Sequence, residues 1–290
     1  MAVLIGSDTR VVVQGITGNQ GSFHTGQMLA YGTKVVAGVS PSKAGTREEH
    51  GIPVFASVRE AVAETGANAS IVFVPAPFAK DAAFEAIAAG VEVLVLIPEH
   101  IPVLDTIAIL EYARYKGTTV VGPNTFGVIS PGKSKMGIMP NPIYRPGPVG
   151  IVARSGTLSY EIASHLTQAG LGQSTVVGMG GDPVAGLTFV EVLTLLEADP
   201  ETEAVVLVGE IGGRAEEDAA AFIQGMTKPV VAYLAGRSAP PGKRMGHAGA
   251  IIERGVGTLE SKRRALEAAG ATVVDMPWEV PEALTRRLSR

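Results

Sequence analysis

One histidine, His247, lies in the stretch MGHAGA among glycine and alanine residues, which offer an imidazole little to pack against. An imidazole becomes a nucleophile when a carboxylate hydrogen-bonds one ring nitrogen and leaves the other nitrogen free. Glu210 ends a buried apolar run in AVVLVGEIGG, and we expect its loop and the loop of His247 to open on the same sheet edge. Small neighbours leave room for a bound group and let the loop move. The pair therefore predicts a histidine that carries a phosphoryl group and a glutamate that orients it.

A second candidate site is the helix start in IVARSGTLSYE, where Ser155, Gly156 and Thr157 follow a buried apolar run. The first turn of a helix presents unpaired N–H groups and a positive dipole end, which together favour a phosphate or a carboxylate. The alternative is an ordinary helix cap, which is worth about 1 kcal/mol without any ligand. The sequence leaves both interpretations open.

A third candidate site follows the first predicted strand, in QGITGNQGS, where Gly15, Gly18 and Gly21 recur at three-residue spacing. Such a turn lets the phosphates of a nucleotide approach the backbone at a helix start. An NAD site requires a carboxylate about 20 residues later. The next strand ends instead in VSPSKAG, which offers Ser40 and Lys43. These residues suit the phosphorylated ribose of either NADP or coenzyme A, with an ordinary solvated lysine as the alternative.

Two further strand ends point towards the same crevice, VPAPF with Pro75 and LIPEH with Ile97, Pro98 and Glu99. Ligands of open α/β sheets bind beyond the carboxyl ends of the strands. These loops are therefore expected to flank an adenine or a pantetheine arm, with plain turns as the alternative.

The elements that must position these residues are short β-branched runs that alternate with amphipathic stretches, the pattern of parallel βαβ units. The predicted strands are 11–14, 34–39, 70–74, 91–97 and 118–121, then 149–153, 175–178, 204–208, 229–234 and 272–275. Helices are predicted at 187–197 and 259–269, among others. The fold class is α/β, with a Rossmann-like domain followed by a flavodoxin-like, doubly wound domain.

The length of 290 residues favours two domains. Between the two series of strands the periodicity fails and prolines recur at 131, 140, 142 and 146. We therefore predict a first domain at 1–123, a linker at 124–148 and a second domain at 149–290.

The composition excludes several classes of function. A formal net charge of −4 does not suit a nucleic-acid-binding protein. The absence of cysteine excludes disulfides, thiolate metal sites and a cysteine nucleophile, and no metal site is predicted. No apolar run approaches the roughly 20 residues of a membrane helix, and the start lacks a signal-peptide pattern. We expect a cytoplasmic protein that binds neither a membrane nor nucleic acid.

Seven stretches together resemble one family, the α subunits of succinyl-CoA synthetase. They occur in the family's order along nearly the whole chain: GITGNQGSFHTGQMLAYGT, GVSPSKAG, GPNTFGVISPG, RSGTLSYE, GGDPV, GEIGG and GHAGA. The resemblance implies a first domain that binds coenzyme A and a second domain whose phosphorylated histidine is His247, oriented by Glu210. Two departures stand out, namely Thr125-Phe126 in place of Cys-Pro and IPEH in place of a Thr-Glu-Gly sequence.

The resemblance also assigns binding residues. It implies that coenzyme A is contacted by Thr17, Gly18, Asn19, Gln20, Lys43, Ile97, Pro98 and Glu99. Tyr160 falls at an acid-substrate position, and the helix start at Ser155 and Gly156 corresponds to the element that holds the histidine phosphate. Succinyl-CoA and phosphate would give succinyl phosphate, and His247 would then take the phosphoryl group.

The same resemblance implies a partner, because the family's nucleotide site lies on a separate β subunit of ATP-grasp fold, which binds the nucleotide with Mg²⁺. The expected assembly is αβ or its dimer. The chain offers no complete P-loop of its own, since GRSAPPGKR has one residue too many between its glycines and an arginine in place of the Ser or Thr. The alternatives are a ligase for acetate, malate or citrate, a regulatory module that binds coenzyme A, and an NADP oxidoreductase.

Overall fold

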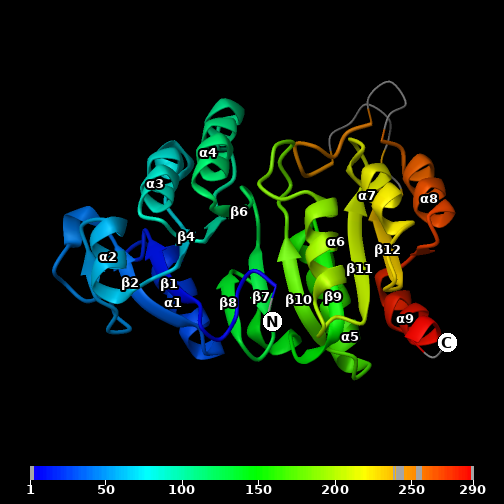
Figure 1. The fold of residues 1–290 in the computed structure, drawn as a ribbon, viewed down its shortest axis with the longest axis horizontal. Coiled ribbons are helices and arrows are strands. Elements are labelled where there is room, and N and C mark those ends of the chain that lie inside the picture. Colours follow the sequence, from blue (N-terminus) through cyan, green and yellow to red (C-terminus); the bar gives the residue numbers. More distant parts are fainter. Residues whose placement is uncertain (1–2, 238, 240–244, 253–256, 289–290) are drawn as a thin grey trace. The chain divides into compact units, whose positions relative to one another are not determined.

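The structure is a computed structural model that describes residues 3–237, 239, 245–252 and 257–288 (Figure 1). The chain divides into two compact units. The N-terminal unit comprises Leu4–Asn141 and Val184–Gly186, and the C-terminal unit is built mainly from Pro142–Pro183 and Leu187–Arg290. In the P-loop-like stretch at 236–244, Ser238 and residues 240–244 lie outside the described part of the chain.

The N-terminal unit contains a parallel sheet with the strand order β3-β2-β1-β4-β5-β6. Its strands are β1 (Arg10–Gln14), β2 (Lys34–Val39), β3 (Val54–Phe55), β4 (Ala69–Val72), β5 (Val93–Leu96) and β6 (Thr119–Val121). The strand order reverses between β1 and β4, as in Rossmann folds. The predicted Rossmann-like domain is therefore confirmed.

Helices accompany these strands because each parallel connection requires a crossover. They are α1 (Asn19–Tyr31), the 3-10 helix η1 (Pro41–Lys43), α2 (Val58–Thr65), α3 (Ala76–Ala88) and α4 (Val103–Lys116). All residues of β4 and β5 are buried, which explains why these strands are apolar except at Ser70. Val12, Leu94 and Ile109 belong to one core cluster of strand and helix side chains.

The C-terminal unit contains parallel strands in the order β13-β12-β11-β9-β10. They are β9 (Pro146–Ala153), β10 (Gln173–Gly178), β11 (Ala204–Glu210), β12 (Val230–Ala235) and β13 (Thr272–Val274). Numbered by appearance, the order is 2-1-3-4-5 read from β10, which is the flavodoxin-like arrangement. The prediction for the second domain is confirmed, and its order reverses between β9 and β11.

The helices of this unit include the two that the sequence predicts at 187–197 and 259–269. In chain order, the helices that follow β8 (Ser134–Gly137) are η2 (Asn141–Ile143), α5 (Gly156–Gln168), α6 (Phe189–Ala198), α7 (Ala215–Ile223), α8 (Leu259–Ala268), η3 (Pro277–Glu279) and α9 (Val280–Leu288). None of the described helices has the length and apolar character that a membrane crossing requires.

The segment 124–148 contains more structure than its broken periodicity indicates. The strands β7 (Gly127–Ser130) and β8 (Ser134–Gly137) form an antiparallel pair. Each has only four residues, which is too short for a clear sequence pattern. The chain passes from one unit to the other between Asn141 and Pro142. The functional division at 1–123, 124–148 and 149–290 stays a prediction.

A short segment after β10, Val184–Gly186, returns to the N-terminal unit. The N–H of Gly186 donates to the carbonyl of Gly122 at 2.8 Å. A Cβ atom on Gly186 would lie 2.1 Å from the carbonyl oxygen of Val120, so only glycine permits this close approach.

Candidate functional site

Glu210 and His247 meet at the carboxyl end of β11. The Nδ1 atom of His247 lies 2.7 Å from the Oε2 atom of Glu210, whose side chain is only 7% exposed. His247 lies in a tight loop that two backbone hydrogen bonds hold. The N–H of His247 donates to the carbonyl of Met245 at 3.0 Å, and the N–H of Met245 donates to the carbonyl of Ala250 at 2.9 Å. The structure thus brings together the two residues that the sequence pairs.

The imidazole of His247 packs directly on the backbone of Gly181. A Cβ atom on Gly181 would lie 2.6 Å from Cγ of the ring, so any side chain there would displace the imidazole. The His247 side chain nevertheless stays 31% exposed, which leaves the ring accessible to a reactant.

The pKa of His247 is raised, mainly because the ring hydrogen-bonds the carboxylate of Glu210. Burial of the ring opposes this rise, the charge of Arg154 opposes it further, and the charge of Asp182 supports it. In the neutral ring the carboxylate favours the proton on Nδ1, because a carboxylate can only accept a hydrogen bond. The Nε2 atom is then left with a lone pair, as a nucleophile requires.

Arg154 is a member of this group that the sequence reasoning missed. Its Nε atom lies 3.4 Å from Oε1 of Glu210, and its side chain is 11% exposed. Its Nη2 atom donates to the carbonyl of Asp182 at 3.1 Å. The carboxylate of Glu210 therefore contacts the guanidinium through one oxygen and the imidazole through the other. The only sequence signal was its place directly before Ser155, at the end of a predicted strand.

The helix start predicted at 155–157 lies at the same edge of the sheet, because β9 pairs with β11. Ser155 caps α5, and its hydroxyl accepts from the N–H of Leu158 at 3.5 Å. Thr157 is exposed on the first turn. Burial raises the pKa of Tyr160 to about 12, so its phenol stays protonated at neutral pH. Ser155 therefore caps the helix, and the first turn of α5 also presents the backbone N–H groups that can bind an anion.

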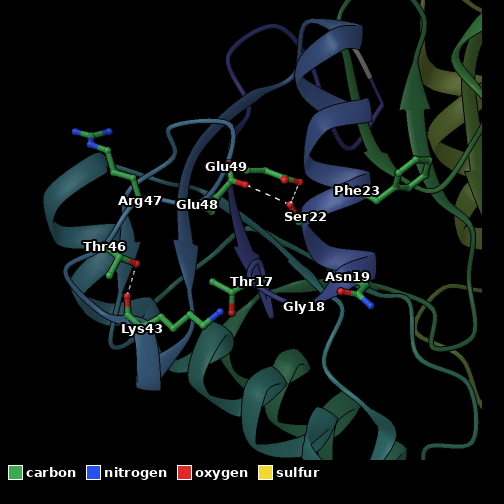
Figure 2. Close-up of a pocket in the computed structure, with 10 residues that line it drawn as sticks. All are labelled: Thr17, Gly18, Asn19, Ser22, Phe23, Lys43, Thr46, Arg47, Glu48 and Glu49. Carbon is green, nitrogen blue, oxygen red and sulfur yellow. Dashed lines mark hydrogen bonds between the residues drawn. The ribbon is translucent and has the colours of Figure 1, made fainter.

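A pocket of about 490 Å³ lies beside the glycine loop of the N-terminal unit (Figure 2). Four of the predicted residues line it, namely Thr17, Gly18, Asn19 and Lys43, and the side chain of Lys43 extends towards Thr17. Additional lining residues that the sequence reasoning missed include Phe23, Thr46 and Arg47. The loop itself depends on close backbone packing, since a Cβ atom on Gly21 would lie 2.1 Å from the carbonyl oxygen of Gly15.

A second pocket of about 560 Å³ lies where the strand order reverses between β1 and β4. It is lined by Ser40 and Pro75, together with Gln14, Gly15, Val39, Pro41, Val74, Phe78, Asp81, Ala82 and Glu85. The hydroxyls of Ser40 and Thr17 are 2.9 Å apart, which links this pocket to the glycine loop.

Four of the predicted binding residues line neither of these pockets. Gln20 is exposed in the first turn of α1, and Ile97, Pro98 and Glu99 follow the end of β5. The Oε1 atom of Glu99 lies 3.5 Å from the Nε2 atom of His100, and both side chains are exposed.

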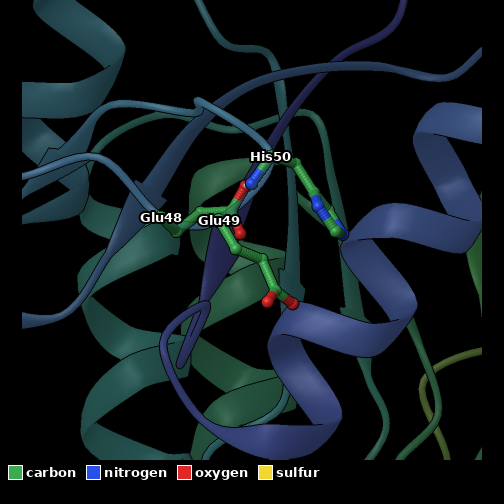
Figure 3. A group of neighbouring side chains, drawn as sticks. All are labelled: Glu48, Glu49 and His50. Atoms are coloured by element: carbon green, nitrogen blue, oxygen red, sulfur yellow. The ribbon is translucent and has the colours of Figure 1, made fainter.

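One group among the described residues has the composition of a metal site, namely Glu48, Glu49 and His50 (Figure 3). Its potential ligand atoms lie within 4.8 Å of one another. However, the carboxylate of Glu48 accepts from the N–H of His50 at 2.9 Å, and the hydroxyl of Ser22 donates to Glu49. The ring of His50 is turned towards α1, where it packs against Gly26. These contacts account for the cluster within the loop.

Both units match known protein families. Residues 6–100 match the CoA binding domain and residues 152–272 match the CoA-ligase family. The solved ATP citrate lyase from Methanothrix soehngenii, in complex with citrate and coenzyme A, is 25% identical with a TM-score of 0.90. The similarity covers 99% of this chain and 51% of the lyase chain, so this chain spans about half of that protein.

A solved dinucleotide-forming acetyl-coenzyme A synthetase 1 from Ca. Korarchaeum cryptofilum, in complex with phosphate and ADP, shares the fold. It has a TM-score of 0.73 and 21% identity, over 93% of this chain and 58% of that chain.

Full-length relatives are much more similar in sequence. Subunit alpha 2 of succinate–CoA ligase (ADP-forming) from Archaeoglobus fulgidus is 62% identical over 288 residues, which cover 99% of this chain and 100% of that protein. The alpha subunit from Methanothermobacter thermautotrophicus is 61% identical over 286 residues, which cover 99% of this chain and 97% of that protein. At this level of identity over nearly its entire length, the chain belongs to the family of succinate–CoA ligase α subunits.

Proposed function

We propose that this chain is the α subunit of a succinate–CoA ligase that conserves thioester energy through a phosphohistidine at His247. The observation that carries the proposal is the 2.7 Å contact between Nδ1 of His247 and Oε2 of Glu210. The names of the relatives support the substrate, succinate, and the two-subunit organisation.

The reaction divides into steps whose atoms balance. Phosphate attacks the thioester carbonyl of succinyl-CoA, the C–S bond breaks, and succinyl phosphate and the thiol of coenzyme A are formed. Nε2 of His247 then attacks the phosphorus, the bond to the succinate oxygen breaks, and phosphohistidine and succinate result. Glu210 holds the proton on Nδ1 and stabilises the positive charge that the ring gains as it bonds to phosphorus.

The anionic reactants are held by the helix start and the pockets described above. We assign phosphate to Ser155, Gly156 and Thr157, which lie at the N-terminal end of α5. We assign the succinate carboxylate to the neighbourhood of Tyr160. Coenzyme A is assigned to the glycine loop and the crevice beside it. Its proposed contacts are Thr17, Gly18, Asn19, Gln20, Ser40, Lys43, Pro75, Ile97, Pro98 and Glu99, and the pocket that Lys43 and Thr17 line supports this assignment.

The nucleotide is assigned to a β subunit of ATP-grasp fold, which would bind it with Mg²⁺. The relatives are named ADP-forming, which supports ADP as the acceptor of the phosphoryl group. We propose that α and β assemble as αβ or as a dimer of that unit, and that the complex is cytoplasmic.

Labelling with γ-³²P-ATP tests the phosphohistidine. We expect the α chain alone to stay unlabelled, the αβ complex to gain acid-labile, base-stable phosphate, and the complex with His247→Asn to lose it. If the His247→Asn complex labels at the normal rate on another residue, the proposed mechanism is wrong.

A panel of acids tests the substrate. The complex should form thioester with succinate at a kcat/KM well above that with citrate, malate or acetate. A higher value for another acid would reassign the chain to a related CoA ligase, while its His247 chemistry would remain.

A further inference from the structure

The strand β11, which ends at Glu210, extends beyond its neighbour β9. The last paired residues of β11 and β9 are Val208 and Ala153, and the N–H of Arg154 donates to the carbonyl of Val208 at 3.2 Å. Backbone groups of successive strand residues point to opposite sides, so the N–H of Glu210 faces the side of β9. There β9 has already ended and the chain continues into α5.

A buried glutamate from α7 takes the place of the absent strand. The Oε1 atom of Glu216 accepts from the N–H of Glu210 at 3.0 Å, and Glu216 is fully buried. Gly209 makes room for this contact, because a Cβ atom at that position would lie 2.7 Å from the same oxygen. The backbone N–H of Glu210 is therefore bound by the buried side chain of Glu216.

Lys262 of α8 completes the arrangement from a second helix. It forms an ion pair with Glu216, and both side chains are 0% exposed. Its Nζ atom also donates to the carbonyl of Gly212 at 2.6 Å. The buried pair thus binds the backbone at residue 210 and again at residue 212.

The loop that the pair holds lies against the loop of the histidine. A Cβ atom on Gly212 would lie 2.1 Å from the carbonyl oxygen of Gly249, two residues after His247. The N–H of Gly212 donates to the carbonyl of Gly257 at 2.8 Å. A shift of residues 210–212 would therefore change both the position of the Glu210 carboxylate and the surroundings of the imidazole.

We propose that the buried Glu216–Lys262 pair positions Glu210 for phosphoryl transfer, by fixing its backbone so that its carboxylate meets Nδ1 of His247. The inference rests on the proposed function of His247. Neither member of the pair touches that histidine in the contacts described above, so both are positioning residues. Stability alone is a weak reason for such a pair, because packed apolar residues often stabilise a core equally well. Apolar replacements would, however, leave the N–H of Glu210 and the carbonyl of Gly212 without their partners.

The test compares variants of the 290-residue chain, alone and in the αβ complex. Glu216→Gln keeps the shape of the side chain and removes its charge, and Lys262→Met removes the donor to Gly212. Lys228→Met is the control, because Lys228, like Lys262, donates to the backbone of this unit; its acceptors are the carbonyls of Leu196 and Asp199, at 2.7 and 2.5 Å. Lys228 precedes β12, so it lies at the opposite end of the parallel strands.

Two readouts separate positioning from folding. NMR of the imidazole Hε1 resonances gives the pKa of His247 in the isolated chain, with His247→Asn for assignment. Labelling by γ-³²P-ATP gives the initial rate of phosphorylation in the complex. In Glu216→Gln and Lys262→Met we expect the raised pKa of His247 to fall towards the value of a free imidazole. We expect the rate of labelling to fall by about tenfold or more, while Lys228→Met changes neither.

Gly209→Ala tests the same positioning role if the charge variants fail to fold. It retains every charged group and adds one methyl group against Glu216, and it should lower both the pKa of His247 and the labelling rate. If the folded variants and Gly209→Ala all behave as Lys228→Met does, the pair is only structural and the inference is overturned. If the wild-type complex carries no label on His247, the proposed function fails instead, whatever the pair does to the imidazole.

Discussion

The parallel strands of each unit reverse their order at one point, and the side chains around the two reversal points differ in character. At the reversal between β1 and β4, glycine turns and a pocket of about 560 Å³ lined largely by apolar and small side chains offer space. At the reversal between β9 and β11, a buried carboxylate contacts a cation and an imidazole at once. The fold therefore supplies a crevice in each unit, whereas charged residues that contact one another distinguish the proposed reactive centre in the C-terminal unit.

Two partly buried histidines, one from each unit, show the same contrast. His24 in the N-terminal unit stacks on Phe73 with ring centres 5.5 Å apart. Burial lowers the pKa of His24, and the charge of Lys135 lowers it further. His247 is partly buried as well, but the hydrogen bond to Glu210 raises its pKa. A charged partner, rather than burial alone, therefore determines the direction.

The largest effect should come from Glu210→Gln. This change keeps the shape of the side chain but removes the charge that supports the imidazolium, so phosphorylation of His247 should slow by about 10- to 1000-fold. Rapid-quench labelling of the αβ complex measures the rate. Calorimetry should find the affinity for coenzyme A unchanged, because the proposed CoA site belongs to the other unit. If the phosphorylation rate and the affinity for coenzyme A fell together, the two proposed sites would not be independent.

A smaller effect is expected from Lys43→Glu at the glycine-loop pocket. The reversed charge would repel the phosphates of coenzyme A and should weaken binding by at least about 1 kcal/mol, as measured by calorimetry. Lys34→Glu is the control, because exposed Lys34 begins β2, the strand that ends just before Ser40 and Lys43. Equal affinities of the two variants would remove Lys43 from the site. Labelling of His247 by ATP should stay normal in both.

The smallest effect concerns pH, and its sign should differ between the units. The raised pKa of His247 means that its contribution to stability is complete below pH 6.5 and is lost as the pH rises through the native value. The lowered pKa of His24 means that its contribution is complete above pH 6.5 and is lost as the pH falls towards the native value.

Imidazole titrations by NMR check this prediction, with His24→Gln and His247→Asn for assignment. His24 should titrate below pH 6.5 and His247 above it. In Arg154→Met, His247 should titrate still higher, because the guanidinium charge opposes protonation of the ring. If His24 and His247 titrated at the same pH, the expected electrostatic difference between the two units would be refuted.

The sequence predicts most of the fold because the buried parallel strands are largely apolar runs between glycine turns. It also pairs Glu210 with His247, because parallel strands present their carboxyl ends at one edge. Arg154 and Glu216 escape prediction for a physical reason: their roles depend on which strands are neighbours. The order β9 beside β11 arises from packing of the whole unit and has no local signature. The four-residue strands β7 and β8 likewise lack a periodic pattern.

The return of Val184–Gly186 to the N-terminal unit bears on how such a protein can recombine. A gene exchange at one point, between the codons of Asn141 and Pro142, would supply the body of one unit from one parent and this short segment from the other. The N–H of Gly186 would then have to meet the carbonyl of a foreign residue at position 122, at a spot where even a methyl group collides with the backbone of Val120. The two units are therefore expected to be inherited together, and chimeras should succeed only when the parents agree around residues 120–122 and 184–186.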